Sequence, residues 1–482
     1  MLEALLFRPS LLSFISAWLG TLGLALLLFS SRRASTKLPP RANGGIYFIS
    51  DILVFLARPV QFVKQATGKH GSVFRIDCLV KQIFYLRGQK WNRFFLEMKE
   101  DTWSFSGGIG MFLNKAANPG YFTHGRNLLG SINRGVNRSA ALQSYGRLAG
   151  EEAHKSLQHW SQMPDVEIFE SVSRFVHRVI VRCMMGEDFY DHHVDELYDL
   201  LQQMESLVGH PFNLLLPSWV PHLPGRQLAQ ARNRFAEIFR ERLAARQLES
   251  DVWHDSLDYI NYTLNDPRTA QLADYYPSHH VVLMFAAHTS TVASIAWTIV
   301  ELLRHPIYQE EIRESLATMS DIHQCAPLLA CLREEGRRYS GVHMFRTTKR
   351  PVSLEGSDYT VPEKSVVLIS PYLTHHDPAI YPEPHEYQPH RWLLPDGRLN
   401  PWNGSKEAAF LQFGAGNHRC PGENFAAIIA REFLAALLMK YEIEWGRDGA
   451  PADLSRLDFT KVGSPWLEGD AAVRIRPRVF GS

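Results

Sequence analysis

The stretch that decides the fold is FGAGNHRCPG, residues 413–422, which is followed by the apolar run ENFAAIIAREFLAALL. Cys420 stands beside His418 and Arg419, and Pro421 is well placed as the first residue of a helix. A thiol at a helix start feels the positive end of the helix dipole, which favours the thiolate. Glycines on both sides let the backbone pass close to a flat or bulky group. The stretch therefore predicts a thiolate that ligates a metal or attacks an electrophile.

Composition narrows the class of protein. With 482 residues, 45% of them hydrophobic, the chain can bury a large core. A net charge of +1 argues against bulk electrostatic binding of nucleic acid. The five cysteines are scattered, which fits a reducing compartment better than a disulfide framework. The sequence also lacks C-x-x-C and H-E-x-x-H zinc motifs and glycine-rich nucleotide motifs.

The amino terminus predicts a membrane anchor. No charged residue occurs between Pro9 and Ser31, and a run of this length suffices to span a bilayer as a helix. Basic residues follow at once, which by the positive-inside rule places the remaining chain in the cytosol. A cleaved signal peptide is disfavoured because its apolar core would be too long and no small-residue cleavage site follows. We therefore expect residues 1–31 to form a single-pass anchor in the endoplasmic reticulum membrane.

The rest of the chain divides into two parts. Residues 32–45 contain Pro-Pro and Gly-Gly pairs and read as a hinge, and residues 46–482 read as one catalytic domain. Helical patterns dominate, with short strands and proline-rich loops between them. The sequence thus predicts a mainly α fold with small β-sheets (α+β). The segments behind this prediction are helices over 46–70 and most of 135–320, a strand pair at 72–79 and 81–86, a loop at 211–225 and short strands beyond 345.

The cysteine stretch resembles the heme-binding signature F-x-x-G-x-x-x-C-x-G of the cytochrome P-450 superfamily. Phe413, Gly416, Cys420 and Gly422 satisfy it without a gap. The resemblance implies that heme b is the cofactor and that the Cys420 thiolate is the axial ligand of its iron. It also implies that His418 pairs with a heme propionate, although arginine is commoner at that position.

Two further motifs of this family lie upstream. LREEGRRYSGVHMFR contains E-x-x-R in two registers, Glu334 with Arg337 or Glu335 with Arg338, and either pair shares one helix face. We prefer Glu334–Arg337 because related sequences then continue in step. The resemblance completes this pair with Arg391 of the segment QPHRW and places Arg346 at the position that usually reaches a propionate.

A fourth match bears on the reaction. VVLMFAAHTSTVASIAW, residues 281–297, resembles the long helix that crosses the heme in this family. In that register Thr289 relays protons and His288 replaces the usual acid, as in the sterol demethylase branch; a space-filling role for His288 stays open. Other resemblances link the chain to sterol demethylases, bile-acid hydroxylases and prostacyclin synthases. By position, the candidate substrate pocket is formed by Phe105, Phe122, Ala286, Val342 and Phe345.

One expected feature is missing, since no W-x-x-x-R marks the helix that contacts a propionate. The basic and aromatic residues in its place leave the choice open among Tyr121, His124, Arg126, Arg134 and Arg138.

Together these features predict a membrane-anchored heme-thiolate monooxygenase. The resemblance implies O2 as oxidant and electrons from an NADPH-dependent flavoprotein reductase, with cytochrome b5 as an optional second donor. The expected substrate is a bulky apolar small molecule, with a sterol or triterpenoid in fungal-type secondary metabolite biosynthesis as first choice. Two alternatives remain: an isomerase or dehydratase that acts on an oxygenated lipid without external electrons, and a non-catalytic heme protein.

Overall fold

A computed structural model describes residues 37–42 and 50–479, apart from residues 78–81, 119, 125, 403, 405–406, 460 and 462. The predicted anchor, residues 1–31, lies outside the described residues, and so does most of the predicted hinge at 32–45.

Helices form most of the described chain, as expected. Those of the amino-terminal half are α2 (Ser50–Ala57), α3 (Pro59–His70), α4 (Gln89–Glu97), α5 (Phe105–Leu113), α6 (Tyr121–His124), α7 (Arg126–Val136), α8 (Ser139–Trp160), α9 (Ile168–Ile180), α10 (Glu187–Val208) and α11 (Pro211–Leu215). Those that follow are α12 (Leu223–Leu248), α13 (Ser250–Trp253), α14 (Tyr259–Asn265), α15 (Tyr276–Arg304), α16 (Pro306–Thr318), α17 (Ala326–Tyr339), α18 (Pro371–His375) and α19 (Glu423–Lys440).

The strands form small sheets. A five-stranded sheet has the order β1-β2-β8-β5-β3, a three-stranded sheet the order β4-β12-β9, and β6–β7 and β10–β11 form two-stranded pairs. Their bounds are β1 (Val73–Asp77), β2 (Gln82–Leu86), β3 (Trp103–Ser104), β4 (Val166–Glu167), β5 (Met344–Thr348), β6 (Val352–Ser353), β7 (Thr360–Val361), β8 (Val366–Ile369), β9 (Tyr441–Trp445), β10 (Leu457–Asp458), β11 (Trp466–Leu467) and β12 (Ala472–Pro477). The predicted strand pair is confirmed, because β1 and β2 pair antiparallel with Val73 opposite Leu86.

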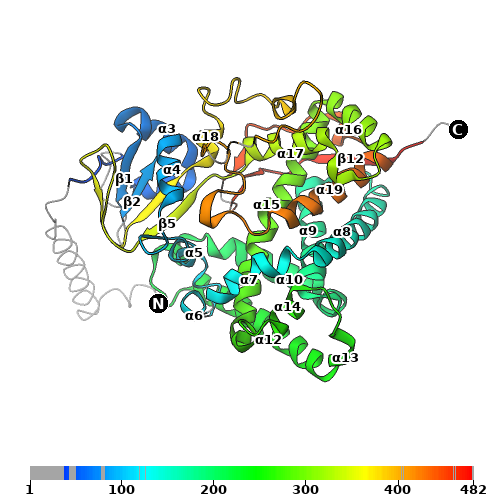
Figure 1. Cartoon of the computed structure of the whole chain (residues 1–482), viewed down its shortest axis with the longest axis horizontal. Helices are drawn as coiled ribbons and strands as arrows, with labels where there is room; N and C mark the ends of the chain where they lie inside the picture. The colour runs from blue at the N-terminus through cyan, green and yellow to red at the C-terminus, as the bar shows by residue number, and fades with distance from the viewer. Residues whose placement is uncertain are drawn as a thin grey trace, which may run out of the picture.

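The core is organised around α15, which runs through the middle of the molecule (Figure 1). Its sequence is apolar on nearly all sides, as expected of a helix packed by neighbours all round. It packs against α9, α17 and α19. Among the described residues, the segment Ala270–Arg304 alone has the length and hydropathy of a membrane-crossing helix, and most of it is buried inside the protein.

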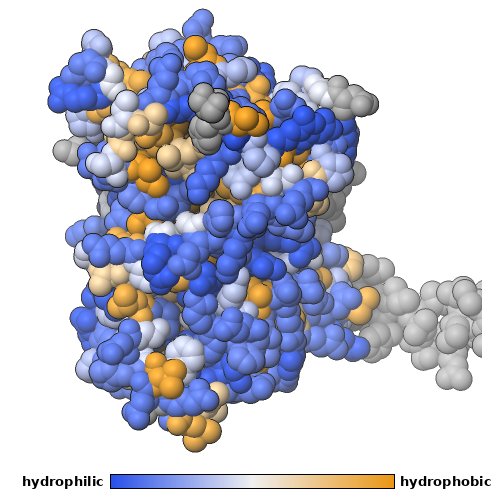
Figure 2. Space-filling view, turned by 90° about the vertical axis from the view of Figure 1, so that its right-hand side faces the viewer, coloured by the Kyte–Doolittle hydropathy of each residue, from blue (hydrophilic) through white to orange (hydrophobic). Residues whose placement is uncertain are grey.

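The five-stranded sheet, with α3 and α4, occupies one side of the molecule, and the larger helical part occupies the other (Figure 1). Helix α5 packs on β5, where these two parts meet. The face shown in Figure 2 is mostly hydrophilic, with apolar residues scattered over it.

Two local expectations need correction. Helix α19 begins at Glu423 rather than at Pro421, because Pro421 and Gly422 form a turn and Gly422 is the residue that precedes the helix. The expected loop at 211–225 contains α11 and the first turn of α12, and in each case a proline lies within the first two helical positions.

Candidate active site

The cysteine loop is closed by its own backbone. The Cys420 N–H donates to the Phe413 carbonyl at 2.8 Å, and Gly414 and Gly416 adopt φ angles of 68° and 67°. Positive φ at both positions favours residues without a Cβ, which explains Gly416 of the signature and the additional Gly414. Cys420 is therefore exposed as a residue, whereas the surrounding loop largely shields its sulfur from solvent.

The loop by itself does not make Cys420 a thiolate. Burial raises the pKa of the Cys420 thiol, and the backbone N–H groups of Gly422 and Glu423 oppose this only in part. The charge of Arg419 is shared with Glu423, since Arg419 Nε lies 2.7 Å from Glu423 Oε2 in an ion pair. A coordinated metal ion deprotonates a thiol outright, so the thiolate depends on the ligated group.

The Glu334–Arg337 pair is fully buried. Two hydrogen bonds of 2.7 and 3.0 Å join the Arg337 guanidinium to the Glu334 carboxylate, and both side chains are 0% exposed. Arg391 adds a contact of 3.2 Å to Glu334, and the Trp392 indole N–H donates to the same carboxylate at 2.8 Å. A buried ion pair is tolerated only when its remaining polar atoms are satisfied. Arg337 meets this condition by donating to the carbonyls of residues 375, 384 and 386.

The other register has different partners. Glu335 accepts a hydrogen bond from Ser294 of α15 at 2.8 Å, and Arg338 pairs with Glu301. Glu335 and Arg338 thus do not form the second pair of the motif. Burial raises the pKa of Glu335 to about 8, despite the Ser294 hydrogen bond.

Helix α15 has one open face in an otherwise buried core. Ala286 and Ser290 are exposed and Ala287 is half-buried. Thr289 and His288, the predicted proton relay, are buried on another side of the helix.

Both of these buried side chains contact Glu205 of α10. The Thr289 hydroxyl donates to Glu205 Oε1 at 2.9 Å, and His288 Nδ1 lies 3.3 Å from the same oxygen. On its other edge, His288 Nε2 lies 3.1 Å from the Ser173 hydroxyl. Glu205 carries no signal in the sequence, because nothing local links residue 205 to α15.

The candidate pocket residues fall into two groups. Around α5, Phe105 begins the helix, the Phe345 ring lies 4.4 Å from the Phe112 ring, and the Phe122 ring lies against Gly110. The second group surrounds Gly463: the Gly463 carbonyl accepts from the Gly341 N–H, next to Val342, at 3.0 Å. A Cβ at Gly463 would lie 2.5 Å from the Ser290 hydroxyl, so this turn touches the open face of α15. Sequence reasoning missed Gly463.

Two predicted propionate contacts, Arg346 and His418, lie near Glu100. Arg346 is buried and donates to the carbonyls of Phe95 and Met98 at 2.8 and 3.0 Å. In the described part of the chain its Nε is buried without a hydrogen-bond partner, and burial lowers the pKa of Arg346 to about 10. His418 Nε2 lies 3.5 Å from Glu100 Oε2.

The structure narrows the choice left open in residues 120–138. The Tyr121 hydroxyl pairs with His279 at 2.9 Å, Arg134 lies 3.7 Å from Asp266, and Arg138 stacks on Tyr262. These three side chains are therefore engaged by the helices around α14 and α15. The His124 ring lies 6.4 Å from the Tyr275 ring, and the side chain of Arg126 is not described.

These residues fit a heme. The Cys420 thiol on its glycine loop can ligate the iron, and the buried Arg346 guanidinium has a spare N–H for a negatively charged propionate. The small residues on the open face of α15 leave room for the macrocycle. The arrangement defines a protein that holds a prosthetic group through a cysteine.

Comparison with known proteins identifies the family. A family model for cytochrome P-450 matches residues 40–464. The cytochrome P-450 monooxygenase pyvB of Aspergillus violaceofuscus is 57% identical over 480 residues, which cover 99% of both chains. The cytochrome P-450 monooxygenase pynD of Aspergillus niger is 51% identical over 445 residues, covering 91% of this chain and 92% of that protein. The solved structure of retinoic acid-bound cyanobacterial CYP120A1 has a TM-score of 0.74 at 20% identity and covers 92% of this chain and 100% of its own, which shows the fold.

The chain therefore belongs to the cytochrome P-450 family. It is a cytochrome P-450 monooxygenase with a heme-thiolate cofactor, and its reaction requires a redox partner that delivers electrons.

Proposed function

We propose that this monooxygenase oxidises a bulky, mainly apolar small molecule in the biosynthesis of a fungal secondary metabolite, with electrons from an NADPH-dependent flavoprotein reductase. The observation that carries the proposal is the Cys420 thiol on its glycine loop, in a chain 57% identical to a named monooxygenase. Bound heme supplies the oxidising chemistry, the reductive activation of O2 and insertion of one oxygen atom into a C–H bond.

The residues proposed to hold the heme are Cys420 as axial ligand, and Arg346 and His418 at the propionates. Phe413 and Gly416 shape the loop around the sulfur. The buried Nε of Arg346 supports its role, since a propionate oxygen would satisfy it. Glu334, Arg337 and Arg391 have a structural role: their buried network fixes α17 against the segment that leads to the cysteine loop.

Proton supply is proposed to run through Thr289 and His288, with Ser290 as the hydroxyl nearest the open face. Glu205 supports this role, because its Oε1 accepts a hydrogen bond from Thr289 and contacts His288 Nδ1. Its Oε2 is buried without a hydrogen-bond partner among the described residues. When protonated on the oxygen that faces Thr289, Glu205 can donate to the Thr289 hydroxyl, which can in turn donate its own proton onward.

The substrate pocket is proposed to lie between Ala286 of α15 and the aromatic residues around α5, namely Phe105, Phe122 and Phe345, with Val342 at its edge. A sterol or triterpenoid is the first class to test, because AAHTS and LLLPSWVP resemble sterol demethylases. We also propose that residues 1–31 anchor the enzyme in the endoplasmic reticulum membrane, with the catalytic domain in the cytosol.

The reduced, CO-bound spectrum tests the site. Wild-type protein should show the strongly red-shifted Soret band of a thiolate ligand, and Cys420→Ser should lose it. A band that survives in Cys420→Ser would contradict the assignment of the ligand. For the function, purified enzyme with reductase and NADPH should oxidise a lipid extract from the producing cells. Turnover of a lipid hydroperoxide without NADPH would instead favour an isomerase or dehydratase.

A further inference from the structure

Helix α5 has a sequence that does not favour a helix. FSGGIGMFL contains three glycines, and each costs about 1 kcal/mol relative to alanine in a helix. Packing explains two of them, because α5 lies directly on β5. A Cβ at Gly108 would lie 2.7 Å from the Phe345 carbonyl oxygen, and a Cβ at Gly107 would collide with the Thr347 hydroxyl. Close packing on the sheet therefore requires residues that weaken α5.

Glu100 compensates at the start of this helix. Its Oε2 accepts from the Phe105 N–H at 2.7 Å, and its Oε1 accepts from the hydroxyls of Ser104 and Ser106 at 2.7 and 2.8 Å. Ser104 is the cap residue of α5, and its oxygen in turn accepts from the Gly107 N–H at 2.9 Å. One carboxylate thus organises the whole first turn.

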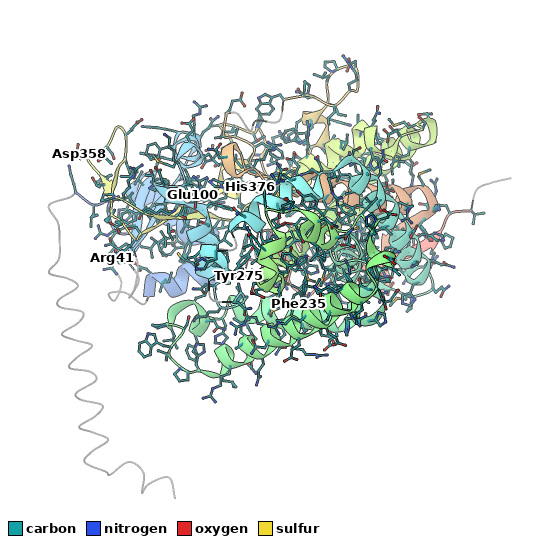
Figure 3. All side chains as sticks on the ribbon, turned by 60° about the horizontal axis from the view of Figure 1, so that its bottom comes forward. Arg41, Glu100, Phe235, Tyr275, Asp358 and His376 are labelled. Carbon is teal, nitrogen blue, oxygen red and sulfur yellow. The ribbon has the colours of Figure 1, made fainter. Side chains whose placement is uncertain are left out.

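The same carboxylate faces the cysteine loop. His418 Nε2 lies 3.5 Å from Glu100 Oε2, and the Phe105 ring stacks on the His418 ring at 4.7 Å and 23°. Lys349 lies 3.9 Å from Glu100 on the side of the sheet. Figure 3 labels Glu100 where the sheet side of the molecule meets the helical side.

Glu100 is suited to hold all these groups as an anion. Burial acts to raise the pKa of its carboxyl, but the hydrogen bonds from Phe105, Ser104 and Ser106 outweigh it, and the pKa of Glu100 is lowered. The basic side chains near it are His418 from the loop and Lys349 after β5, and the charge of Glu100 also acts on Arg346 of β5.

We propose that Glu100 is a positioning residue that couples the cysteine loop to α5, so that heme retention and the substrate-side wall of the pocket form together. If the cysteine loop moved away, Glu100 would lose its contact with His418, and the Phe105 ring would lose the His418 ring on which it stacks. Helix α5 would then be held less firmly in place. The inference rests on the proposed function for the group held at Cys420 and for the placement of the substrate pocket beside α5.

Hydrogen exchange tests the coupling in the full-length holoenzyme. In wild-type protein, removal of the heme should speed amide exchange over residues 105–113 by about tenfold, as expected of a locally stabilised element. In Glu100→Gln these amides should exchange fast with heme bound, and the heme dependence should disappear. The matched control is Glu97→Gln, an exposed carboxylate at the end of α4, which should behave as wild type.

Heme loss to excess apomyoglobin is the second measurement. Glu100→Gln should release heme roughly three- to tenfold faster, the size of one lost charge-assisted contact. Ser106→Ala removes one hydrogen bond to Glu100 and leaves the contact between Glu100 and His418. The α5 amides should therefore exchange faster than in wild type, and their exchange should still depend on heme. If Glu100→Gln does not accumulate, Phe105→Leu removes the stacked ring and tests the same coupling.

Two outcomes would overturn the inference. If exchange in Glu100→Gln stays as heme-dependent as in wild type, or if its heme loss is unchanged, Glu100 is a helix cap and nothing more. The reduced, CO-bound spectrum keeps this result separate from the proposed function. If α5 exchange depends on heme in a protein whose CO-bound spectrum lacks the thiolate band, Cys420 is not the ligand, whereas the coupling through Glu100 holds.

Discussion

At the scale of single residues, burial separates two carboxylates that are adjacent in sequence. Glu334 is fully paired by Arg337, Arg391 and Trp392, whereas Glu335 has a neutral partner, Ser294. The same helix turn therefore holds one carboxylate that the fold needs charged and one that it favours protonated.

Glu334→Gln should be strongly destabilising, because it leaves the Arg337 guanidinium buried and unpaired. We expect the free energy of unfolding to fall by about 3–5 kcal/mol, measured by urea denaturation. Glu423→Gln is the matched control, since it breaks an exposed pair with Arg419 and should cost less than about 1 kcal/mol. Equal losses in the two variants would contradict a special role of the buried network.

Glu335 should make stability depend on pH. Its pKa is about 8 in the folded protein against an ordinary 4.5, so between these values the folded state keeps a proton that the unfolded state has lost. Stability is then expected to decrease as the pH rises through this window. Glu335→Gln should remove this component, so its melting temperature should fall less than that of wild type between pH 5 and pH 8. Parallel curves for the two proteins would show that Glu335 is ionised in the fold.

At the scale of elements, α15 presents different hydroxyls on different sides. Thr289→Val would deprive the Glu205 carboxylate of a donor and should lower the free energy of unfolding by about 1–3 kcal/mol. Ser290→Ala, on the open face, should change it by less than about 0.5 kcal/mol. Both variants should release more H2O2 per NADPH consumed, because both hydroxyls belong to the proposed proton path. If Thr289→Val releases no more H2O2 per NADPH than wild type, Thr289 does not belong to that path.

The turn between β10 and β11 offers a second test at this scale. Gly463 and Gly469 have φ angles of 93° and 82°, so alanine strains the backbone at both. Only at Gly463 would the new Cβ meet the Ser290 hydroxyl, whereas at Gly469 nothing lies within 4 Å. Gly463→Ala should therefore weaken binding of an azole probe, measured by spectral titration, about tenfold more than Gly469→Ala does. Similar affinities in both variants would place Gly463 outside the pocket.

These elements also show what a sequence can predict. The cysteine loop was accessible because its residues lie a few positions apart. The Glu334–Arg337 pair was accessible through its resemblance to related sequences, since Glu335–Arg338 has the same spacing. Glu205, Glu100 and Gly463 were not, since their partners lie on other elements far along the chain. The start of α19 was misjudged because Pro421 and Gly422 form a turn, so that the helix begins at Glu423.

At the scale of the whole molecule, the described residues hold both the core and the proposed heme site. Helices α17 and α19 both pack on α15, and the cysteine loop lies in the segment between α18 and α19. The anchor and the catalytic domain should therefore be separable.

Deleting residues 2–31 should move the protein from the membrane fraction toward the soluble fraction and leave its heme site intact. The physical reason is that an apolar run long enough to span a bilayer contributes most of the membrane affinity, whereas the buried network lies wholly in the domain. Fractionation of cells measures the first effect, and the reduced, CO-bound spectrum measures the second. A matched variant with Leu19→Arg and Leu22→Arg should behave like the deletion, because a charge at the centre of a span costs about 2.5–3.5 kcal/mol. A truncated protein that stays fully in the membrane fraction would show that another surface of the domain binds lipid.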